Sequence, residues 1–299
     1  KMGSPDSAMI QSYRKAYQKR MHKLGIDPAI FQTTLSIPEA DFVGRGEIKK
    51  DQNQSTLTLR IQARDTVYTL SRWNIWVNEV PAFGQSGRSI QGKNTLDTTI
   101  TISLSQGINY IETSVTNKNG AESYRTPLVV NYTPTSPYQA KTLFIGIGVD
   151  RYVDSQHNLR YSVKDIRDLV AKLQTTLKEE LIVDTLFDEQ VTLANVLKLK
   201  ERLKAMNVDD KIILAYSGHG LLNDSFEYFL STHDIDFKHP EKKGLPYQEI
   251  ENLLDHLPCR KVVVLIDACH SGEVDKEEMK SRRRRADTLN LKTGTKGII

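Results

Sequence analysis

Three apolar runs in the second half of the chain constrain its fold most strongly. They occupy 141–149, 211–216 and 261–266, and after an opening lysine each is nearly all hydrophobic instead of alternating. A strand has this character when helices cover both faces of a parallel sheet. Between the runs lie further predicted elements: a helix at 163–177, a strand at 181–187, a helix after Thr192, a strand near 228–232 and a helix at 247–254. This alternation predicts an α/β domain with a mostly parallel sheet and helices on both faces.

The first half of the chain carries different signals. A length of 299 residues allows roughly two domains of ordinary size. Residues 1–30 are predicted to form a helical connector, because 7–24 lacks interior Gly and Pro. In 31–135, polar and apolar residues alternate at 56–63 and 99–104, as in half-buried strands. We therefore predict a β-sandwich at 31–135, similar to an immunoglobulin-like domain.

Two turn signals complete this domain plan. Asn119-Gly120 lies between two strand-like segments and predicts a tight type I′ hairpin, whose two central residues both have positive φ. The Thr-Pro-Thr-Ser-Pro segment at 133–137 predicts a linker, after which the α/β domain occupies 138–299.

Composition indicates which partners and which compartment to expect. The net charge of +4 is small for this length, so it does not call for nucleic acid as a partner. No stretch approaches the roughly 18 apolar residues of a membrane span. The two cysteines, Cys259 and Cys269, suit a reducing compartment. We expect a cytoplasmic protein without nucleic-acid or membrane partners, although a start at Lys1 leaves room for a missing upstream segment.

Two of the apolar runs lead into a reactive side chain. His219 follows 211–216, and Cys269 follows 261–266. The carboxyl ends of parallel strands meet at one edge of a sheet, where sites of α/β domains form. A thiol becomes a strong nucleophile when an imidazole takes its proton. The arrangement therefore predicts a Cys-His catalytic pair. Cys259 has no such context and is predicted to be a structural thiol.

The sequences Tyr-Ser-Gly-His-Gly at 216–220 and Asp-Ala-Cys-His-Ser-Gly at 267–272 resemble those of the caspase-like clan of cysteine peptidases. A histidine about fifty residues before the cysteine is the caspase spacing. Within the clan the second sequence is most similar to metacaspases and bacterial orthocaspases, because caspases have Gln where Asp267 stands. The resemblance implies that Cys269 is the nucleophile and that His219 is the general base and acid. It also implies that the Gly220 and Cys269 N–H groups stabilise the oxyanion.

Substrate preference can be argued from charge. Asp267 lies two residues before Cys269, on the same side of an extended strand, and would place a carboxylate near the primary specificity pocket. Asp165 matches the acidic residue that metacaspase-like enzymes use in the same pocket. Two carboxylates can bind a guanidinium through charge-assisted hydrogen bonds, so we predict cleavage after Arg or Lys. The alternatives are local hydrogen bonding for Asp267 and a solvated helix-face charge for Asp165.

No cofactor or metal is predicted to be required. The remaining histidines lack ligand spacing with one another or with a cysteine. Metacaspases are often activated by calcium, but four acidic residues here do not have the spacing of an EF-hand loop: Asp224, Glu227, Asp234 and Asp236. Calcium activation is therefore left open without support from the sequence.

The end of the chain suggests processing. The charged segment 273–287 has little to bury and contains Arg282, Arg283, Arg284 and Arg285, which predicts a solvated linker and a self-cleavage site. Caspase-like folds need further strands, so we expect a separate C-terminal small-subunit fragment as a partner, besides a protein or peptide substrate and a regulatory protein. Two other functions stay open: a catalytically silent adaptor that docks partners through the sandwich, and a peptidase of acidic specificity.

Overall fold

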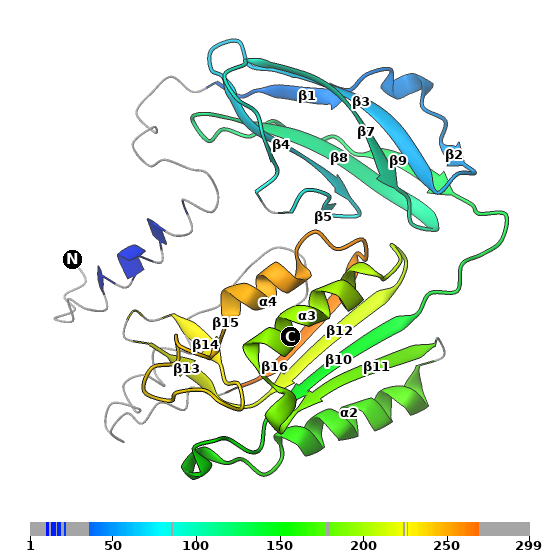
Figure 1. Cartoon of the computed structure of the whole chain (residues 1–299). Coiled ribbons are helices and arrows are strands. Elements are labelled where there is room, and N and C mark those ends of the chain that lie inside the picture. Colours follow the sequence, from blue (N-terminus) through cyan, green and yellow to red (C-terminus); the bar gives the residue numbers. More distant parts are fainter. Residues whose placement is uncertain are drawn as a thin grey trace. The chain divides into compact units, whose positions relative to one another are not determined.

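The computed structural model describes residues 36–268, except 85, 178, 179, 224 and 226, together with 10, 11, 13–15, 17, 18 and 21. Cys269 and Arg282 to Arg285 lie outside the described residues, as does most of the predicted connector 1–30, whose described residues are helical. Contacts divide the chain into two compact units, Lys1–Tyr138 and Gln139–Ile299 (Figure 1).

The described strands of the first unit form two β-sheets. One is antiparallel, with the strand order β1 (Glu39–Phe42), β3 (Thr56–Arg64), β7 (Thr95–Ser103). The other has the order β2 (Asp51–Gln52), β9 (Leu128–Tyr132), β8 (Gly107–Asn117), β4 (Leu70–Val77), β5 (Val80–Pro81), with β6 (Arg88–Ser89) paired to β4. A short 3-10 helix, η2 (Arg45–Glu47), follows β1.

Alternate residues of both sheets form one hydrophobic core. Leu59 and Ile61 of β3 pack in the same buried cluster as Ile75 of β4 and Ile111 and Val115 of β8. The period-two pattern at 56–63 is confirmed, because every second residue of β3 from Leu59 onward is buried. The unit thus has two sheets with a shared core, and its immunoglobulin-like character stays a prediction.

The predicted type I′ hairpin at Asn119-Gly120 is wrong. Only Gly120 has a positive φ, of 80°. The Asn117 side chain instead accepts hydrogen bonds from the N–H groups of Asn119 and Ala121, both at 3.0 Å, and so shapes a different turn. A two-residue turn with both φ values positive does occur at Asn78 and Glu79, between β4 and β5. Its Asn-Glu sequence lacks the glycine that marks such turns.

The second unit is built on a parallel sheet, as predicted. Its strand order is β11 (Leu181–Phe187), β10 (Thr142–Gly148), β12 (Lys211–Ser217), β16 (Lys261–Asp267). The described part of this unit contains the helices α2 (Ser162–Thr176), α3 (Leu193–Lys204) and α4 (Tyr247–Leu254), with short 3-10 helices η3 (Ser155–His157) and η4 (Asp188–Gln190). A small antiparallel sheet contains β13 (Gly220–Leu222), β14 (Tyr228–Leu230) and β15 (Leu245–Pro246).

Helices cover both faces of the parallel sheet (Figure 1). Leu143, Ile145 and Ile147 of β10 belong to the core that contains residues of α3 and α4, whereas Phe144 belongs to the core with Ile166 of α2. Alternate β10 residues therefore face opposite helical layers. Among the helices of the described segments, none combines the length and apolar character that crossing a bilayer requires.

Glycines in β10 allow α2 to lie close to the sheet. A Cβ atom on Gly146 would lie 2.4 Å from Ile166 Cγ2, and one on Gly148 would lie 3.1 Å from the Val163 Cα. No side chain can fit in the first of these gaps unless its neighbours move. The position of α2, and with it that of Asp165, therefore depends on these glycines.

Candidate active site

His219 lies just beyond the carboxyl end of β12, on the short segment that leads into β13. Its Nε2 is 2.8 Å from the main-chain oxygen of His157. A carbonyl oxygen can only accept, so Nε2 carries the proton and donates it in this bond. The His219 ring also contacts the rings of Tyr152 and Phe237, with centroids at 5.3 Å and 5.6 Å. The imidazole therefore has a defined orientation and tautomer.

The environment of His219 favours its neutral form. Burial lowers the pKa of His219, the hydrogen bond to the His157 carbonyl raises it, and the nearby His157 side chain lowers it again. The net shift is downward from the ordinary value of 6.5. A neutral imidazole can accept a proton, which a general base must do.

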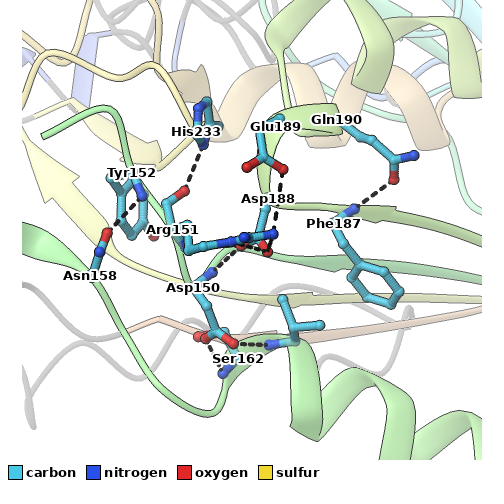
Figure 2. A network of polar contacts seen from close by, with 11 residues as sticks. Asp150, Arg151, Tyr152, Asn158, Ser162, Phe187, Asp188, Glu189, Gln190 and His233 are labelled. Carbon is cyan, nitrogen blue, oxygen red and sulfur yellow. Dashed lines mark hydrogen bonds and ion pairs between the residues drawn. The ribbon is translucent and has the colours of Figure 1, made fainter. Parts of the chain in front are cut away.

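The segment 150–161, between β10 and α2, supplies the carbonyl that holds His219. Asp188 accepts hydrogen bonds from the N–H groups of Asp150 and Arg151, both at 2.9 Å, and an ion pair joins it to the Arg151 side chain (Figure 2). The Asn158 side chain accepts from the Tyr152 N–H at 2.9 Å. These side-chain bonds to main chain fix a segment that has only one short 3-10 helix of its own.

The same segment fixes the start of α2. Asp150 accepts from the N–H groups of Ser162 and Val163, at 2.7 Å and 3.3 Å, so its carboxylate caps the helix (Figure 2). Asp165 lies in the first turn of this helix. One network of carboxylates therefore positions both the contact to His219 and the helix turn that carries Asp165.

Asp165 and Asp267 line one cavity at the carboxyl ends of the strands. Its volume is about 200 Å³, and its walls come from α2, β12 and β16: Asp165, Ile166, Leu169, Ala215, Tyr216, Ser217, Leu265, Ile266 and Asp267. Both carboxylates belong to exposed residues, and Asp267 is paired in register with Ser217. Residues about 100 positions apart in the sequence thus contribute two acidic groups to the lining of one cavity.

Gly220 begins β13 and lies against Tyr228. A Cβ atom at Gly220 would be 2.0 Å from the Tyr228 hydroxyl oxygen. That hydroxyl donates to the Ala268 carbonyl at 3.2 Å, so it links the histidine segment to the residue before Cys269. The close approach accounts for glycine at position 220.

The predicted structural cysteine and the acidic residues considered for calcium have other positions. Cys259 is buried, and its Sγ is 2.9 Å from the Asp210 carbonyl oxygen, away from the strand ends that carry the cavity. Asp234 and Asp236 form ion pairs with Lys243 and Lys242, at 3.0 Å and 3.1 Å. In the part of the chain that the structure describes, no group of three or more His, Cys, Asp or Glu residues could hold a metal ion. Asp224 is not among the described residues.

Comparison with protein families assigns this unit. The caspase domain family matches residues 142–297. The chain belongs to the caspase domain family. The matched region begins with β10 and includes every element that positions His219, Asp165 and Asp267. Members of this family are cysteine peptidases, so the predicted class of hydrolase and a protein substrate are supported at the level of the family.

Other comparisons add little. No curated protein matches significantly. The caspase-domain chain is similar to protein GSU0716 from Geobacter sulfurreducens, with 23% identity and a TM-score of 0.38 over 52% of this chain and 67% of that one. It is also similar to fibronectin(III)-like modules of Clostridium thermocellum CbhA, with 12% identity and a TM-score of 0.26 over 36% of this chain and 53% of that one. The chain thus spans between about half and two thirds of these solved proteins.

Sequence reasoning missed the main-chain partner of His219. The predicted site contained side chains and two N–H groups, but not the His157 carbonyl or the Tyr152 ring. Neither has a distinctive spacing, since position 157 contributes its backbone.

Proposed function

We propose that this caspase-domain protein is a cysteine endopeptidase that cleaves peptide bonds after Arg or Lys. The observation that carries the specificity is the cavity that Asp165 and Asp267 share. A guanidinium or ammonium group entering it would meet two carboxylates and apolar walls suited to the methylene stem of Arg or Lys. The same carboxylates would repel an acidic side chain.

The proposed reaction uses Cys269 and His219. Neutral His219 accepts the proton of the Cys269 thiol, and the thiolate attacks the carbonyl carbon of the scissile bond. The Gly220 N–H, together with that of Cys269, stabilises the negative charge on the carbonyl oxygen. Protonated His219 then gives its proton to the departing amine as the peptide C–N bond breaks. Water, deprotonated by His219, hydrolyses the resulting thioester and restores the thiol.

Processing and partners form part of the same proposal. An enzyme that cuts after Arg would accept its own segment Arg282 to Arg285 as a substrate. A separate C-terminal fragment would then complete the sheet next to β16, and the first unit would bind a regulatory protein. Intact-mass analysis after prolonged incubation tests the first step, because one unbroken chain would rule out self-cleavage.

The decisive experiment compares peptides that differ only in the residue before the cleaved bond. Fluorogenic peptides ending in Arg, Lys, Gln or Asp are incubated with wild type, Cys269→Ala, Asp165→Asn and Asp267→Asn. Loss of a charged hydrogen bond costs about 1.5–3 kcal/mol, so each Asn variant should reduce kcat/KM for the Arg peptide by about 10- to 100-fold. Asp168→Asn is the matched control, because Asp168 lies one turn further along α2 and pairs with exposed Lys164.

Each outcome separates the candidate functions. Turnover of the Arg or Lys peptide that disappears in Cys269→Ala supports the proposal. Turnover of the Asp peptide alone would keep the peptidase and reject the acidic pocket. No turnover by the complete chain, with its C-terminal fragment and with calcium supplied, would favour the silent adaptor.

A further inference from the structure

Three buried hydroxyl groups surround the main chain of His219. They belong to Tyr152, Tyr216 and Ser231, which we call the hydroxyl cluster. The Ser231 Oγ is 2.7 Å from the Tyr152 hydroxyl and 2.9 Å from the Tyr216 hydroxyl. All three residues are at most 4% exposed. Such a cluster must satisfy its donors and acceptors internally.

The hydrogen-bond directions in the cluster follow from its carbonyl partners. The Tyr216 hydroxyl donates in a bifurcated hydrogen bond, to the Ser231 carbonyl at 2.8 Å and to the His219 carbonyl at 3.2 Å. Since its single proton is used there, Tyr216 accepts from the Ser231 hydroxyl. The Ser231 Oγ can then accept from the Tyr152 hydroxyl and from the His219 N–H, which is 3.1 Å away. Burial raises the pKa of Tyr216 well above its ordinary value, so its hydroxyl stays protonated.

These contacts fix the peptide unit between His219 and Gly220. The His219 carbonyl accepts from the Ser231 N–H at 2.9 Å and lies in reach of the Tyr216 hydroxyl. A trans peptide unit is planar, and its C=O and N–H point in opposite directions. The Gly220 N–H therefore points away from β14.

The strand register leads to the same orientation. Hydrogen bonds from the Ser231 N–H to the His219 carbonyl and from the Asn223 N–H to the Glu227 carbonyl lie at the two ends of the β13–β14 ladder. In an antiparallel ladder, hydrogen-bonded and non-hydrogen-bonded pairs alternate, so the pair Gly220 and Leu230 between them is non-hydrogen-bonded. Its N–H groups face outward from the pair. Gly220 thus presents its N–H on the side of β13 away from β14, and this side pairs with no described strand. The proposed role as an oxyanion donor requires such an orientation.

The absence of a side chain at Gly218 leaves room for the Tyr216 hydroxyl beside the main chain. A Cβ atom on Gly218 would lie 2.5 Å from the Tyr216 hydroxyl oxygen. The tyrosine side chain therefore extends toward the carboxyl end of the strand, past Gly218, and reaches the carbonyl of His219. The Tyr-Ser-Gly-His-Gly sequence thus places the tyrosine hydroxyl beside the peptide unit that joins His219 to Gly220.

We propose that Tyr216 is a positioning residue for transition-state stabilisation, because its hydroxyl and Ser231 hold the peptide unit that aims the Gly220 N–H. The inference rests on the proposed peptidase activity, but it concerns a residue to which neither the family match nor the predicted site gives a role. Tyr216 acts through the His219–Gly220 peptide unit.

The test measures the complete chain with Tyr216→Phe, Ser231→Ala and Tyr152→Phe. Removing an oxyanion donor typically lowers kcat by roughly 10²- to 10³-fold, so loosening one should lower kcat by about 10-fold or more while KM stays within about twofold. A peptide aldehyde, which forms a tetrahedral adduct with the thiol, should lose affinity by a similar factor in Tyr216→Phe. Ser231→Ala and Tyr152→Phe each remove a hydroxyl of the cluster but no bond to the His219 carbonyl, because the bond from Ser231 comes from its main-chain N–H. Their losses of aldehyde affinity should therefore be clearly smaller.

The controls separate the possible failures. Thermal unfolding and the rate of Cys269 alkylation by iodoacetamide show whether a variant is folded and whether the thiol is still activated. A folded Tyr216→Phe enzyme with wild-type kcat and aldehyde affinity would overturn the inference and leave the peptidase intact. Equal losses for Tyr152→Phe and Tyr216→Phe would also overturn it, because they would indicate a general packing role. Wild type without turnover or Cys269-dependent labelling would instead refute the proposed function itself.

Discussion

At the scale of single residues, His219 is defined by what holds it. Its ring is oriented by the His157 carbonyl and by the rings of Tyr152 and Phe237, while its main chain is held by the hydroxyl cluster. The hydrogen-bond partner of the imidazole Nε2 among these contacts is a neutral carbonyl, and burial is the largest cause of the shift in pKa. The pKa of His219 is therefore controlled mainly by burial, which favours the neutral form.

This environment predicts the acid limb of the pH profile. The base must be neutral to accept the thiol proton, and a lowered pKa keeps it neutral to more acidic pH. As pH falls, kcat/KM for the Arg peptide should therefore remain high through pH 6.5, the ordinary histidine value, and decline only below it. The measurement is kcat/KM against pH under conditions where the protein stays folded. A half-maximal value at or above pH 6.5 would contradict the lowered pKa.

At the scale of elements, the contact between β10 and α2 decides where Asp165 lies. Gly146 faces Ile166 and Phe144 so closely that a methyl group has no room. Overpacking a well-packed core costs about 1–3 kcal/mol. A side chain added at position 146 would push α2 away from β10 and so move the first turn of α2, which carries Asp165, relative to Asp267 across the cavity.

Gly146→Ala should accordingly lower the free energy of unfolding by about 1–3 kcal/mol and weaken the preference for Arg over Gln peptides. Urea unfolding monitored by far-UV circular dichroism gives the first value, and peptide kinetics give the second. Ile166→Ala in the Gly146→Ala background should cost less than it does alone, because the new methyl group fills part of the space. Gly46→Ala is the control, since a Cβ there would meet nothing within 4 Å. Strict additivity of the two changes would argue against the proposed contact.

The elements also show what could be predicted from sequence. Strand β11 and helix α4 have the predicted bounds, and the Thr192 side chain caps α3 by accepting from the Asn195 N–H. Their hydrophobic periods and caps are local properties. The turn at Asn119 was mispredicted because the Asn117 side chain, two residues earlier, determines its main-chain bonds. The contacts that orient His219 could not be predicted either, because they join segments that are distant in the sequence and that no local hydrophobic period connects.

At the scale of the whole molecule, the two units have separate hydrophobic cores. Both tryptophans of the chain, Trp73 and Trp76, lie in β4 of the first unit. Tryptophan fluorescence therefore reports on the first unit, whereas thiol labelling at Cys269 reports on the second. One sample can follow both units.

Asp65 provides a test of acid stability in the first unit. Burial raises the pKa of Asp65, but hydrogen bonds from Asn117, Tyr68, Val67 and Ser36 lower it by more, so that the net pKa is about 2 instead of 3.8. A carboxylate whose pKa is lower in the folded than in the unfolded state stabilises the fold at pH values above its unfolded-state pKa. This stabilisation is lost as the pH falls through the folded-state pKa. By this linkage Asp65 contributes about 2 kcal/mol at neutral pH, and the contribution should disappear between about pH 4 and pH 2.

Urea unfolding followed by tryptophan fluorescence checks this expectation. Asp65→Asn should be less stable than wild type at pH 6, and the difference should shrink as the pH approaches 2. Exposed Asp51, replaced by Asn, serves as the comparison. A constant gap between wild type and Asp65→Asn across this pH range would mean that the carboxylate charge contributes nothing.

The contact between His219 and the His157 carbonyl has a consequence for mutational scanning. Every residue has the same main-chain oxygen at position 157, and proline would remove only the N–H that donates to the Asp154 carbonyl, so a scan of side chains would not detect the role of this oxygen. The invariant feature is the path of the chain from Asp150 to Ser162, which Asp188 and Asn158 hold in place. Loss of the contact between His219 and the His157 carbonyl should therefore be found by mutating Asp188 or Asn158, and replacement of the 157–158 amide by an ester would probe the weakened carbonyl directly.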